Sequence, residues 1–307
     1  MPGLSRLRSQ QPPPAPLAMV IVGASTVGLE IGRVAELLAA RGHLVTSVAQ
    51  EPVDGEPPAN ADALLAGTDL VVVLGGDGSI LRAARWMGYT QVPALGINLG
   101  RLGFLADISR TDTAPAVDEL EAGRFRLVDH MMFECEVVRG GRVIHRELGL
   151  NETSLLAGPP FTMIEIDLVV DDEPATTYRA DGLIASTPVG STAYNLSAGG
   201  PIVRKDMDAF VFTPLNPHTL TNRTVIDSAA RRYELRVPRP NAGSACLVDG
   251  RVVAALVAGD AIRVRRAEPR FTLVEIGGQG YYRTLREKLA WGGGLRAAAP
   301  GQPGNRS

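Results

Sequence analysis

Residues 70–79 read LVVVLGGDGS. Five apolar residues in a row are typical of a strand that is covered on both faces, as in a parallel sheet flanked by helices. The glycines then allow a sharp turn, and Ser79 is placed to cap a helix in which Ile80, Ala84 and Met87 share one face. A buried strand, a glycine turn and a helix in direct succession predict an α/β architecture.

The segments around this stretch repeat the alternation of strands and helices. Apolar runs predict strands at 17–22, 44–48 and 94–97, and apolar residues at helical spacing predict a helix between the first two of them. The proline-rich residues 51–60 are interpreted as a loop. We therefore expect residues 17–125 to form an N-terminal Rossmann-like α/β domain, with helices on both faces of a parallel sheet.

The pattern changes after about residue 126, where short β-rich runs follow one another with turn residues between them. Apolar and polar residues alternate most clearly at 164–170, which is typical of a half-buried strand. A second, all-β domain is therefore predicted over residues 126–270. Its expected strands are 133–138, 143–144, 164–170, 182–187, 209–213, 233–237, 252–257 and 261–265.

The two ends of the chain are expected to differ from both domains. Residues 271–291 resume the α/β style, with a strand at 271–276 and a helix near 281–290 that is expected to pack back on the first domain. Residues 1–16 contain Gln10-Gln11 and a proline cluster at 12–16, and residues 292–307 are rich in glycine, alanine and proline. Neither segment can bury enough apolar surface to offset the entropy of ordering. Both tails are predicted to be disordered.

The bulk composition limits the function classes. Hydrophobic residues make up 45% of the chain, charged residues 21%, and the formal net charge is −2. This composition predicts a soluble globular protein without the basic field that attracts nucleic acid, and no apolar run is long enough to span a membrane. Cys135 and Cys246 fit no metal spacing or disulfide framework. We therefore expect a cytoplasmic protein without nucleic-acid or membrane partners.

The loop Gly75-Gly76-Asp77-Gly78 is the strongest functional signal. Glycines let the backbone approach phosphate oxygens, and the start of the following helix adds favourable partial charge. A tight turn with an aspartate cap is the plainer alternative. A carboxylate beside phosphate is unfavourable without a task, and the two candidate tasks for Asp77 are accepting a proton from a hydroxyl or holding a metal ion.

Three further segments carry candidate site residues. Residues 181–201 are rich in glycines and hydroxyls that suit a ribose or phosphate, although a long surface loop has a similar composition. Asn151 and Glu152 are side by side after a strand, a weak signal by itself. Residues 100–106 read GRLGFLA and also fit a helix–strand connection with a core phenylalanine.

Two other functions compete at this point. A redox or non-catalytic dinucleotide-binding protein built around Val20–Gly23 could use Glu51 as its ribose-binding acid. However, residues 23–28 lack the G-x-G-x-x-G spacing that lets the backbone meet a pyrophosphate. A lipid kinase would share the GGDG loop but not the long 181–201 motif.

In combination, and in their order along the chain, the four motifs resemble those of the NAD kinase family, over roughly residues 17–291. The resemblance implies an N-terminal α/β domain, a C-terminal β-sandwich-like domain and a site in the cleft between them. It also implies a homo-oligomer, usually a dimer or tetramer. The implied reaction transfers a phosphoryl group from ATP or polyphosphate to NAD, with Mg²⁺ or another divalent metal bridging phosphate oxygens.

The resemblance also implies a role for each matching residue. Asp77 is the expected catalytic base for the 2′-hydroxyl of the adenosine ribose, and Gly75, Gly76 and Gly78 are expected to cradle phosphates. Arg251 stands where several family members have a nucleotide-binding Gln. The other implied nucleotide contacts are Arg82, Phe104 (lining the adenine pocket), Asn151 and Glu152 (holding a ribose), Arg179, Asp181, Val189, Thr192, Ala193, Tyr194 and Ser197.

Overall fold

The computed structural model describes residues 7, 16–48, 61–100, 103–218, 223–277 and 281–289. The chain divides into two compact units, Met1–Gly277 and Gly278–Ser307. The predicted loop at 51–60, the C-terminal tail and nearly all of the N-terminal tail lie outside the described residues. The predicted domain boundaries near 125 and 270 fall inside the first unit and stay predictions.

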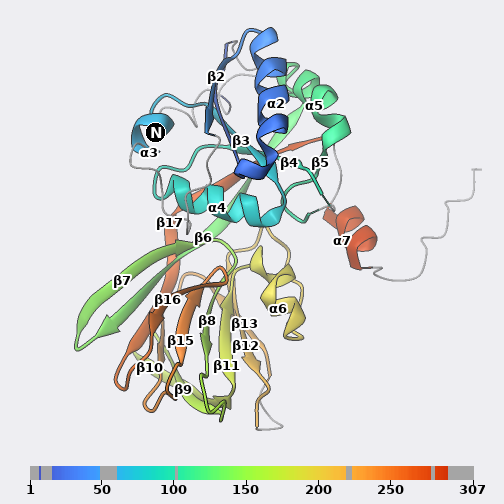
Figure 1. Ribbon diagram of the computed structural model, residues 1–307. Helices are drawn as coiled ribbons and strands as arrows, with labels where there is room; N and C mark the ends of the chain where they lie inside the picture. Colours follow the sequence, from blue (N-terminus) through green and yellow to red (C-terminus); the bar gives the residue numbers. More distant parts are fainter. Residues whose placement is uncertain are drawn as a thin grey trace, which may run out of the picture. The chain divides into compact units, whose positions relative to one another are not determined.

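The N-terminal part is the predicted α/β arrangement, drawn in blue to green in Figure 1. Four strands pair in parallel in the order β4-β3-β1-β2. Their bounds are β1 Ala18–Gly23, β2 Leu44–Val48, β3 Leu70–Gly75 and β4 Ala94–Asn98, with the short β5 Ile108–Ser109 beside β4. The helices are α2 Gly28–Ala40, α3 Ala61–Leu65, α4 Asp77–Met87 and α5 Thr113–Glu121.

Strand β3 is buried on both faces, as its apolar sequence predicts. Val71 and Val73 pack in one core cluster with Ile80 of α4. The alternate residues Leu70, Val72 and Leu74 pack in another cluster with residues of α2 and α5. Side chains that alternate along the strand therefore meet a helix layer on each side of the sheet.

The β-rich part forms two packed layers, as shown in the lower half of Figure 1. One layer is a six-stranded antiparallel sheet in the order β13-β12-β11-β8-β15-β16, and the other continues the first sheet. Buried aromatic rings, Phe133, Phe210, Phe212 and Tyr233, contact one another in the core between them. The strands are β7 Arg142–Gly149, β8 Glu152–Leu156, β9 Ile164–Val170, β10 Glu173–Ala180, β11 Gly182–Ser186, β12 Ala209–Leu215, β13 Val225–Ser228, β14 Tyr233–Arg236, β15 Ala245–Val248 and β16 Arg251–Ala255.

Two long strands connect the two parts, β6 (Phe125–Arg139) and β17 (Ala261–Ile276). They pair with each other along nearly their whole length. β17 also pairs with β14 of the β-rich part and, through Leu273 and Ala94, in parallel with β4. The prediction of separate strands at 261–265 and 271–276 was wrong, because β17 passes through an irregularity between Arg266 and Arg270 without ending. The charged run and the proline there hide the continuity.

In the second unit, α7 (Tyr281–Leu289) is the predicted terminal helix. Its expected return to the first domain stays a prediction. None of the helices within the described residues is long and apolar enough to cross a membrane.

Candidate active site

The glycine turn after β3 is required by its geometry. Gly75 has a φ of +145°, and a Cβ there would lie 2.2 Å from the Oγ of Ser79. The prediction that Ser79 caps the helix was wrong: the N-cap is Gly76, and Ser79 lies inside α4, where its Oγ accepts a hydrogen bond from Arg82 at 3.0 Å. The helix therefore begins with backbone N–H groups and no capping side chain, an arrangement suited to binding an anion.

Asp77 joins the glycine turn to the 100–106 motif. Its carboxylate accepts the backbone N–H groups of Phe104 at 2.7 Å, Leu105 at 2.9 Å and Ala106 at 3.2 Å. The close approach also explains Gly103, because a Cβ there would lie 1.9 Å from Oδ1 of Asp77. The two motifs, which the sequence presents separately, therefore form one structure. Phe104 is half-buried rather than a core residue.

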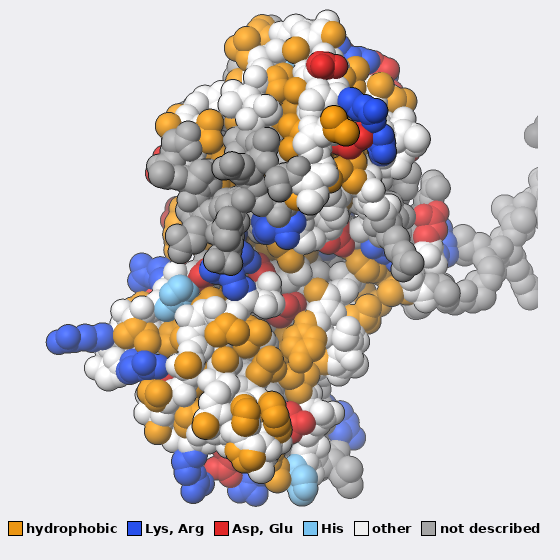
Figure 2. Space-filling model, viewed as in Figure 1, with side chains coloured by type: hydrophobic (Ala, Val, Ile, Leu, Met, Phe, Trp, Pro, Cys, Tyr) orange, Lys and Arg blue, Asp and Glu red, His pale blue; other side chains and the backbone are white. Residues whose placement is uncertain are grey.

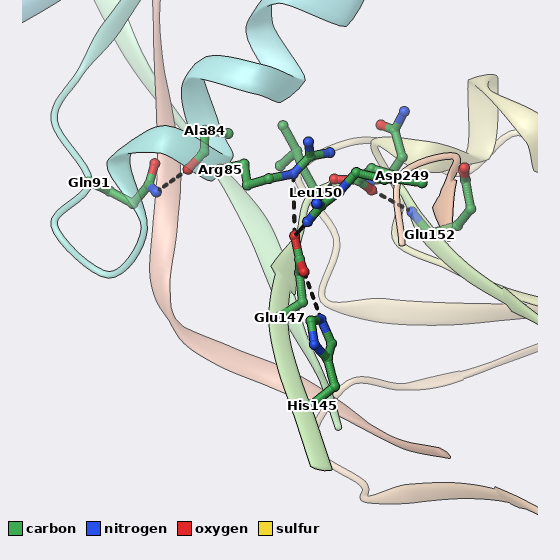
Figure 3. A network of polar contacts seen from close by, with 10 residues as sticks. Ala84, Arg85, Gln91, His145, Glu147, Leu150, Glu152 and Asp249 are labelled. Carbon is green, nitrogen blue, oxygen red and sulfur yellow. Dashed lines mark hydrogen bonds and ion pairs between the residues drawn. The ribbon is translucent and has the colours of Figure 1, made fainter. Parts of the chain in front are cut away.

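A second aspartate organises the turn before β8 in the same way. The buried carboxylate of Asp249 accepts the N–H groups of Leu150 at 2.9 Å, Asn151 at 2.8 Å and Glu152 at 3.1 Å (Figure 3). Burial raises the pKa of Asp249, while the three N–H donors oppose that rise. Asp249 and Gly250 both have positive φ, as a two-residue turn between β15 and β16 requires. Asp249 thus holds in place the backbone that carries Asn151 and Glu152.

Glu152 is the most perturbed acid of this region. Its side chain is 5% exposed and accepts a hydrogen bond from the backbone N–H of Tyr194. Burial, with a smaller contribution from the charge of Asp249, raises the pKa of Glu152 to about 8. Its buried Oε2 has no hydrogen-bond partner within the described part of the chain. A buried carboxyl oxygen of this kind is suited to a ligand hydroxyl.

The 181–201 motif is not a surface loop. After β11 it forms the short helices η4 (Gly190–Thr192) and α6 (Tyr194–Ser197). Thr187 donates its N–H to the Asn151 carbonyl at 2.8 Å and its hydroxyl to the Leu150 carbonyl at 2.6 Å. A Cβ on Gly190 would lie 2.0 Å from the Asn151 carbonyl oxygen. This motif therefore packs tightly against the Asn151–Glu152 turn.

Helix α4 lies against both of these segments. Ile80 and Ala84 of α4 share an apolar cluster with Leu150 and Val189. The side chain of Val189 therefore faces the core, which leaves only its backbone for a nucleotide. Of the other predicted contacts in the motif, Thr192 and Ala193 are half-buried, and Tyr194 and Ser197 are exposed.

Arg251 takes part in an ion-pair network that the sequence did not reveal. It pairs with Glu147, whose carboxylate also lies 3.4 Å from Arg85 of α4 and 2.9 Å from His145. Figure 3 shows Arg85, Glu147 and Asp249 converging from three different elements. Burial lowers the pKa of Arg85, and the charge of Arg251 adds to that effect. The one sequence pattern that could have indicated this network is the pair of arginines at 82 and 85, which are one helical turn apart on α4.

Arg179 and Asp181 lie away from this cluster. Asp181 accepts a hydrogen bond from Asn216 at 2.9 Å, and Arg179 pairs with Glu165 at 3.0 Å. Along β11, Gly182 pairs with Leu156 and Ser186 pairs with Glu152. At about 3.3 Å per strand residue, Asp181 is roughly 16 Å along the strand from the Glu152 end.

The rival site at Val20–Gly23 depends on Glu51, which is outside the described residues.

Comparisons with known proteins find matches in one family. A family model for the ATP-NAD kinase N-terminal domain matches residues 26–125, and one for the ATP-NAD kinase C-terminal domain matches residues 150–276. The NAD kinase of Rhodopirellula baltica is 52% identical over 227 residues, which are 74% of this chain and 73% of the relative. The NAD kinase of Geobacter metallireducens is 42% identical over 224 residues, 73% of this chain and 79% of the relative.

Solved structures give the same result for the fold. An NAD kinase from Archaeoglobus fulgidus in complex with ATP superposes with a TM-score of 0.71 at 26% identity, over 90% of this chain and all of the other. Yeast NADH kinase complexed with NADH gives a TM-score of 0.79 at 24% identity, over 92% of this chain and 90% of the other. At that identity, the second likeness concerns the fold alone.

Proposed function

Since this chain belongs to the NAD kinase family, we propose that it transfers the γ-phosphate of ATP to the 2′-hydroxyl of the adenosine ribose of NAD, which yields NADP and ADP. The observation that carries the proposal is the convergence of the motifs. Asp77 binds the 104–106 backbone, α4 packs against Leu150 and Val189, and Glu152 accepts the N–H of Tyr194. These contacts support the proposal that the motifs contribute to one site.

Asp77 is proposed as the base of this reaction. A carboxylate has about four lone-pair positions, and three of them receive N–H donors from residues 104–106. The remaining position can accept the proton of the ribose hydroxyl. The oxygen of that hydroxyl then forms the new bond to the γ-phosphorus. The bond from that phosphorus to the bridging oxygen breaks, and ADP leaves with that oxygen. The glycine turn and the start of α4 would bind the phosphates.

The acceptor would be held by the Asn151–Glu152 turn. The buried Oε2 of Glu152 is available for a ribose hydroxyl, and Tyr194 offers an exposed aromatic surface beside it. With a pKa of about 8, this carboxyl carries a proton at neutral pH and can donate as well as accept a hydrogen bond. Arg82, Phe104, Thr192, Ala193, Ser197 and Arg251 complete the proposed nucleotide contacts.

Magnesium fits this site as part of the substrate. No group of three or more His, Cys, Asp or Glu side chains that could hold a metal is found among the described residues. Mg²⁺ commonly keeps several waters and binds through substrate phosphates. We therefore infer that the ion arrives as the MgATP complex. Inorganic polyphosphate remains a second proposed donor, because the glycine turn would contact only the phosphates of ATP.

We also propose that the enzyme is a homo-oligomer, a dimer or tetramer. If Arg179 and Asp181 contact nucleotide, their distance from Glu152 favours a nucleotide bound on a second copy of the chain. Figure 2 shows hydrophobic side chains grouped over the region where Figure 1 places β15 and β16. Val252 of β16 is 61% exposed, and exposed apolar surface is typical of an interaction site. Sedimentation of wild type and Val252→Asp would test this, and an unchanged monomer in both would reject it.

The proposed compartment is the cytoplasm. Cys135 and Cys246 are buried free thiols whose sulfurs are 3.9 Å apart, and a reducing compartment keeps such a pair unoxidised. The net charge of −2 gives no reason to expect nucleic acid as a partner.

The decisive experiment is direct. Purified protein is incubated with NAD, ATP and Mg²⁺, and NADP is followed with an NADP-specific dehydrogenase. We expect NADP to form only when both NAD and ATP are present. Parallel reactions contain inorganic polyphosphate instead of ATP. A folded protein that makes no NADP with either donor would overturn the proposed function.

A further inference from the structure

Lysine is almost absent from this chain. Of its 31 lysines and arginines, only Lys205 and Lys288 are lysines, so Lys205 is the single lysine of the unit Met1–Gly277. The two cations differ in kind. Arginine is a rigid, planar fork, whereas lysine is a compact charge on a flexible stem that can change partners. A chain that otherwise uses arginine throughout this unit therefore uses a different cation at position 205.

Lys205 lies in a segment that is fixed to the hydroxyl-rich motif. Two residues earlier, the Val203 N–H donates to the Oγ of Ser191 at 3.0 Å. The carbonyl of Lys205 lies 3.5 Å from Nδ1 of His130, which belongs to β6. The backbone of this segment is thus held from two sides, while the lysine stem extends from it with 21% of the side chain exposed.

Among the residues that the structure describes, the ammonium of Lys205 has one carboxylate as its direct partner. Its Nζ donates to Oε1 of Glu275 at 2.6 Å. The other oxygen of Glu275 pairs with Arg126 at 2.9 Å, so Glu275 retains a cation when Lys205 moves away. Burial, with the nearby charge of Lys205, lowers the pKa of His130 to about 4, so His130 is neutral and is not a competing cation beside Glu275. Exchange of Lys205 between Glu275 and another anion is therefore possible without leaving Glu275 unpaired.

Asp107 connects Lys205 to the proposed transfer site. It directly follows Ala106, whose N–H binds Asp77. The carboxyl of Asp107 interacts electrostatically with Glu275, Lys205 and Asp77, and burial is the main cause that raises its pKa to about 6. Lys205 and Asp77 thus both interact electrostatically with Asp107.

Carboxylates near the glycine turn oppose the binding of a phosphate by charge repulsion. A phosphate that approaches the glycine turn meets the carboxylate of Asp77, with which Asp107 interacts electrostatically, and repulsion between such charges is strong where water is excluded. Arg82 supplies a cation from α4. A second cation that can move to the phosphate would offset the remaining repulsion, and a flexible ammonium is better suited to this than a guanidinium fixed by two bonds.

We propose that Lys205 is a phosphate-binding residue of the transfer site, which exchanges its ion pair with Glu275 for the terminal phosphates of the donor. The inference rests on the proposed function for the identity of the donor. It does not alter the role of Asp77, which accepts the proton, because Lys205 acts only on the charge of the phosphates.

The test compares Lys205→Met and Lys205→Arg with a matched control, Arg204→Met, in the full-length protein. Arg204 is the neighbouring cation, exposed and paired with Asp206 at 2.9 Å, so its removal changes the net charge equally. MgATP binding is measured by calorimetry, and kcat and KM are measured separately for ATP and NAD. Thermal unfolding reports the fold of each variant.

Lys205→Met is expected to weaken MgATP binding and lower kcat/KM for ATP by about 10- to 100-fold, the usual worth of a charged hydrogen bond. NAD binding without ATP should change less than about twofold, Lys205→Arg should recover part of the loss, and Arg204→Met should match wild type. Unchanged MgATP binding in Lys205→Met overturns the inference. So does an equal loss of NAD and ATP binding in both Lys205 variants with a lowered unfolding midpoint, which marks a structural role. Because calorimetry needs no turnover, this result is separable from a wild type that makes no NADP.

Discussion

Oδ1 of Asp249 accepts the backbone N–H of Asn151 at 2.8 Å, although the two residues are 98 positions apart in the chain. The same carboxylate holds the N–H groups on either side of Asn151. A residue of the β15–β16 turn thereby fixes the conformation of a turn that is proposed to bind a ribose. Its effect on the nucleotide is indirect, through the backbone that it supports.

Asp249→Asn should reveal this supporting role. The amide keeps one acceptor oxygen and tolerates the positive φ of 47°, but its NH₂ group faces N–H donors. We expect a loss of about 1–3 kcal/mol in unfolding free energy, measured by urea denaturation, and a raised KM for NAD. The exposed Asp118→Asn should cost less than about 1 kcal/mol, because it affects only a surface pair with Arg41. Equal stabilities of the two variants would contradict the supporting role.

Glu152 should make stability depend on pH in a defined direction. Its pKa is about 8 in the folded protein against an ordinary 4.5, so the folded state retains a proton that the unfolded chain releases. The stabilisation is complete below about pH 4.5 and is lost as pH rises through about 8. The unfolding free energy of wild type should therefore fall relative to that of Glu152→Gln between pH 5 and 8.5, by at most about 1.4 kcal/mol per pH unit.

Chemical denaturation at several pH values measures this difference. The exposed Glu36→Gln on α2 removes the same carboxyl and should run parallel to wild type. A difference between wild type and Glu152→Gln that is constant over this range would show that Glu152 does not carry the proton.

Asp77→Asn tests the proposed base. The amide oxygen can still accept an N–H from residues 104–106, so the fold should persist, while the proton acceptor is lost. We expect kcat to fall by about 10²–10⁴-fold, the usual contribution of general base catalysis, with little change in KM for NAD. Asp62→Asn, in the first turn of α3, is the control. Near wild-type turnover in Asp77→Asn would remove this residue from the mechanism.

Gly103→Ala tests the position of Asp77 without changing any charge. The added Cβ would lie 1.9 Å from Oδ1 of Asp77, so the carboxylate or the loop must shift. A displacement of this size should lower kcat by about 10²-fold. Gly32→Ala in α2 adds the same methyl group into open space and should stabilise the helix by up to about 1 kcal/mol without affecting kcat. Steady-state kinetics and thermal unfolding of both variants provide the comparison.

The local parts of the fold were predictable from sequence. The strand at 44–48 matches β2, and the apolar run at 70–74 is buried on both faces of the sheet. The family motifs also implied that Asp77, Asn151 and Glu152 belong to one site, which stays a prediction, since a resemblance carries spatial information that periodicity does not. The confirmed architecture therefore rests on short-range patterns and on one specific set of motifs.

What the sequence did not reveal depends on contacts between distant segments. An Asp-Gly pair between two strands predicts a turn, but nothing nearby shows that the Asp249 side chain binds residues 150–152. The pairing of Glu147 with Arg85 and Arg251 likewise joins three separate elements. β17 escaped recognition because its continuity is maintained by β6 opposite, while its own sequence is interrupted by charges and a proline.

The shared strand has a consequence for movement. Because β17 is hydrogen-bonded to β14 at one end and to β4 at the other, a hinge between the two halves would have to break a ladder of backbone bonds. We therefore expect any movement on substrate binding to occur in short segments such as residues 103–106 and 187–200. Heating should accordingly melt the unit Met1–Gly277 in one cooperative transition, since the eleven-stranded sheet runs through both halves.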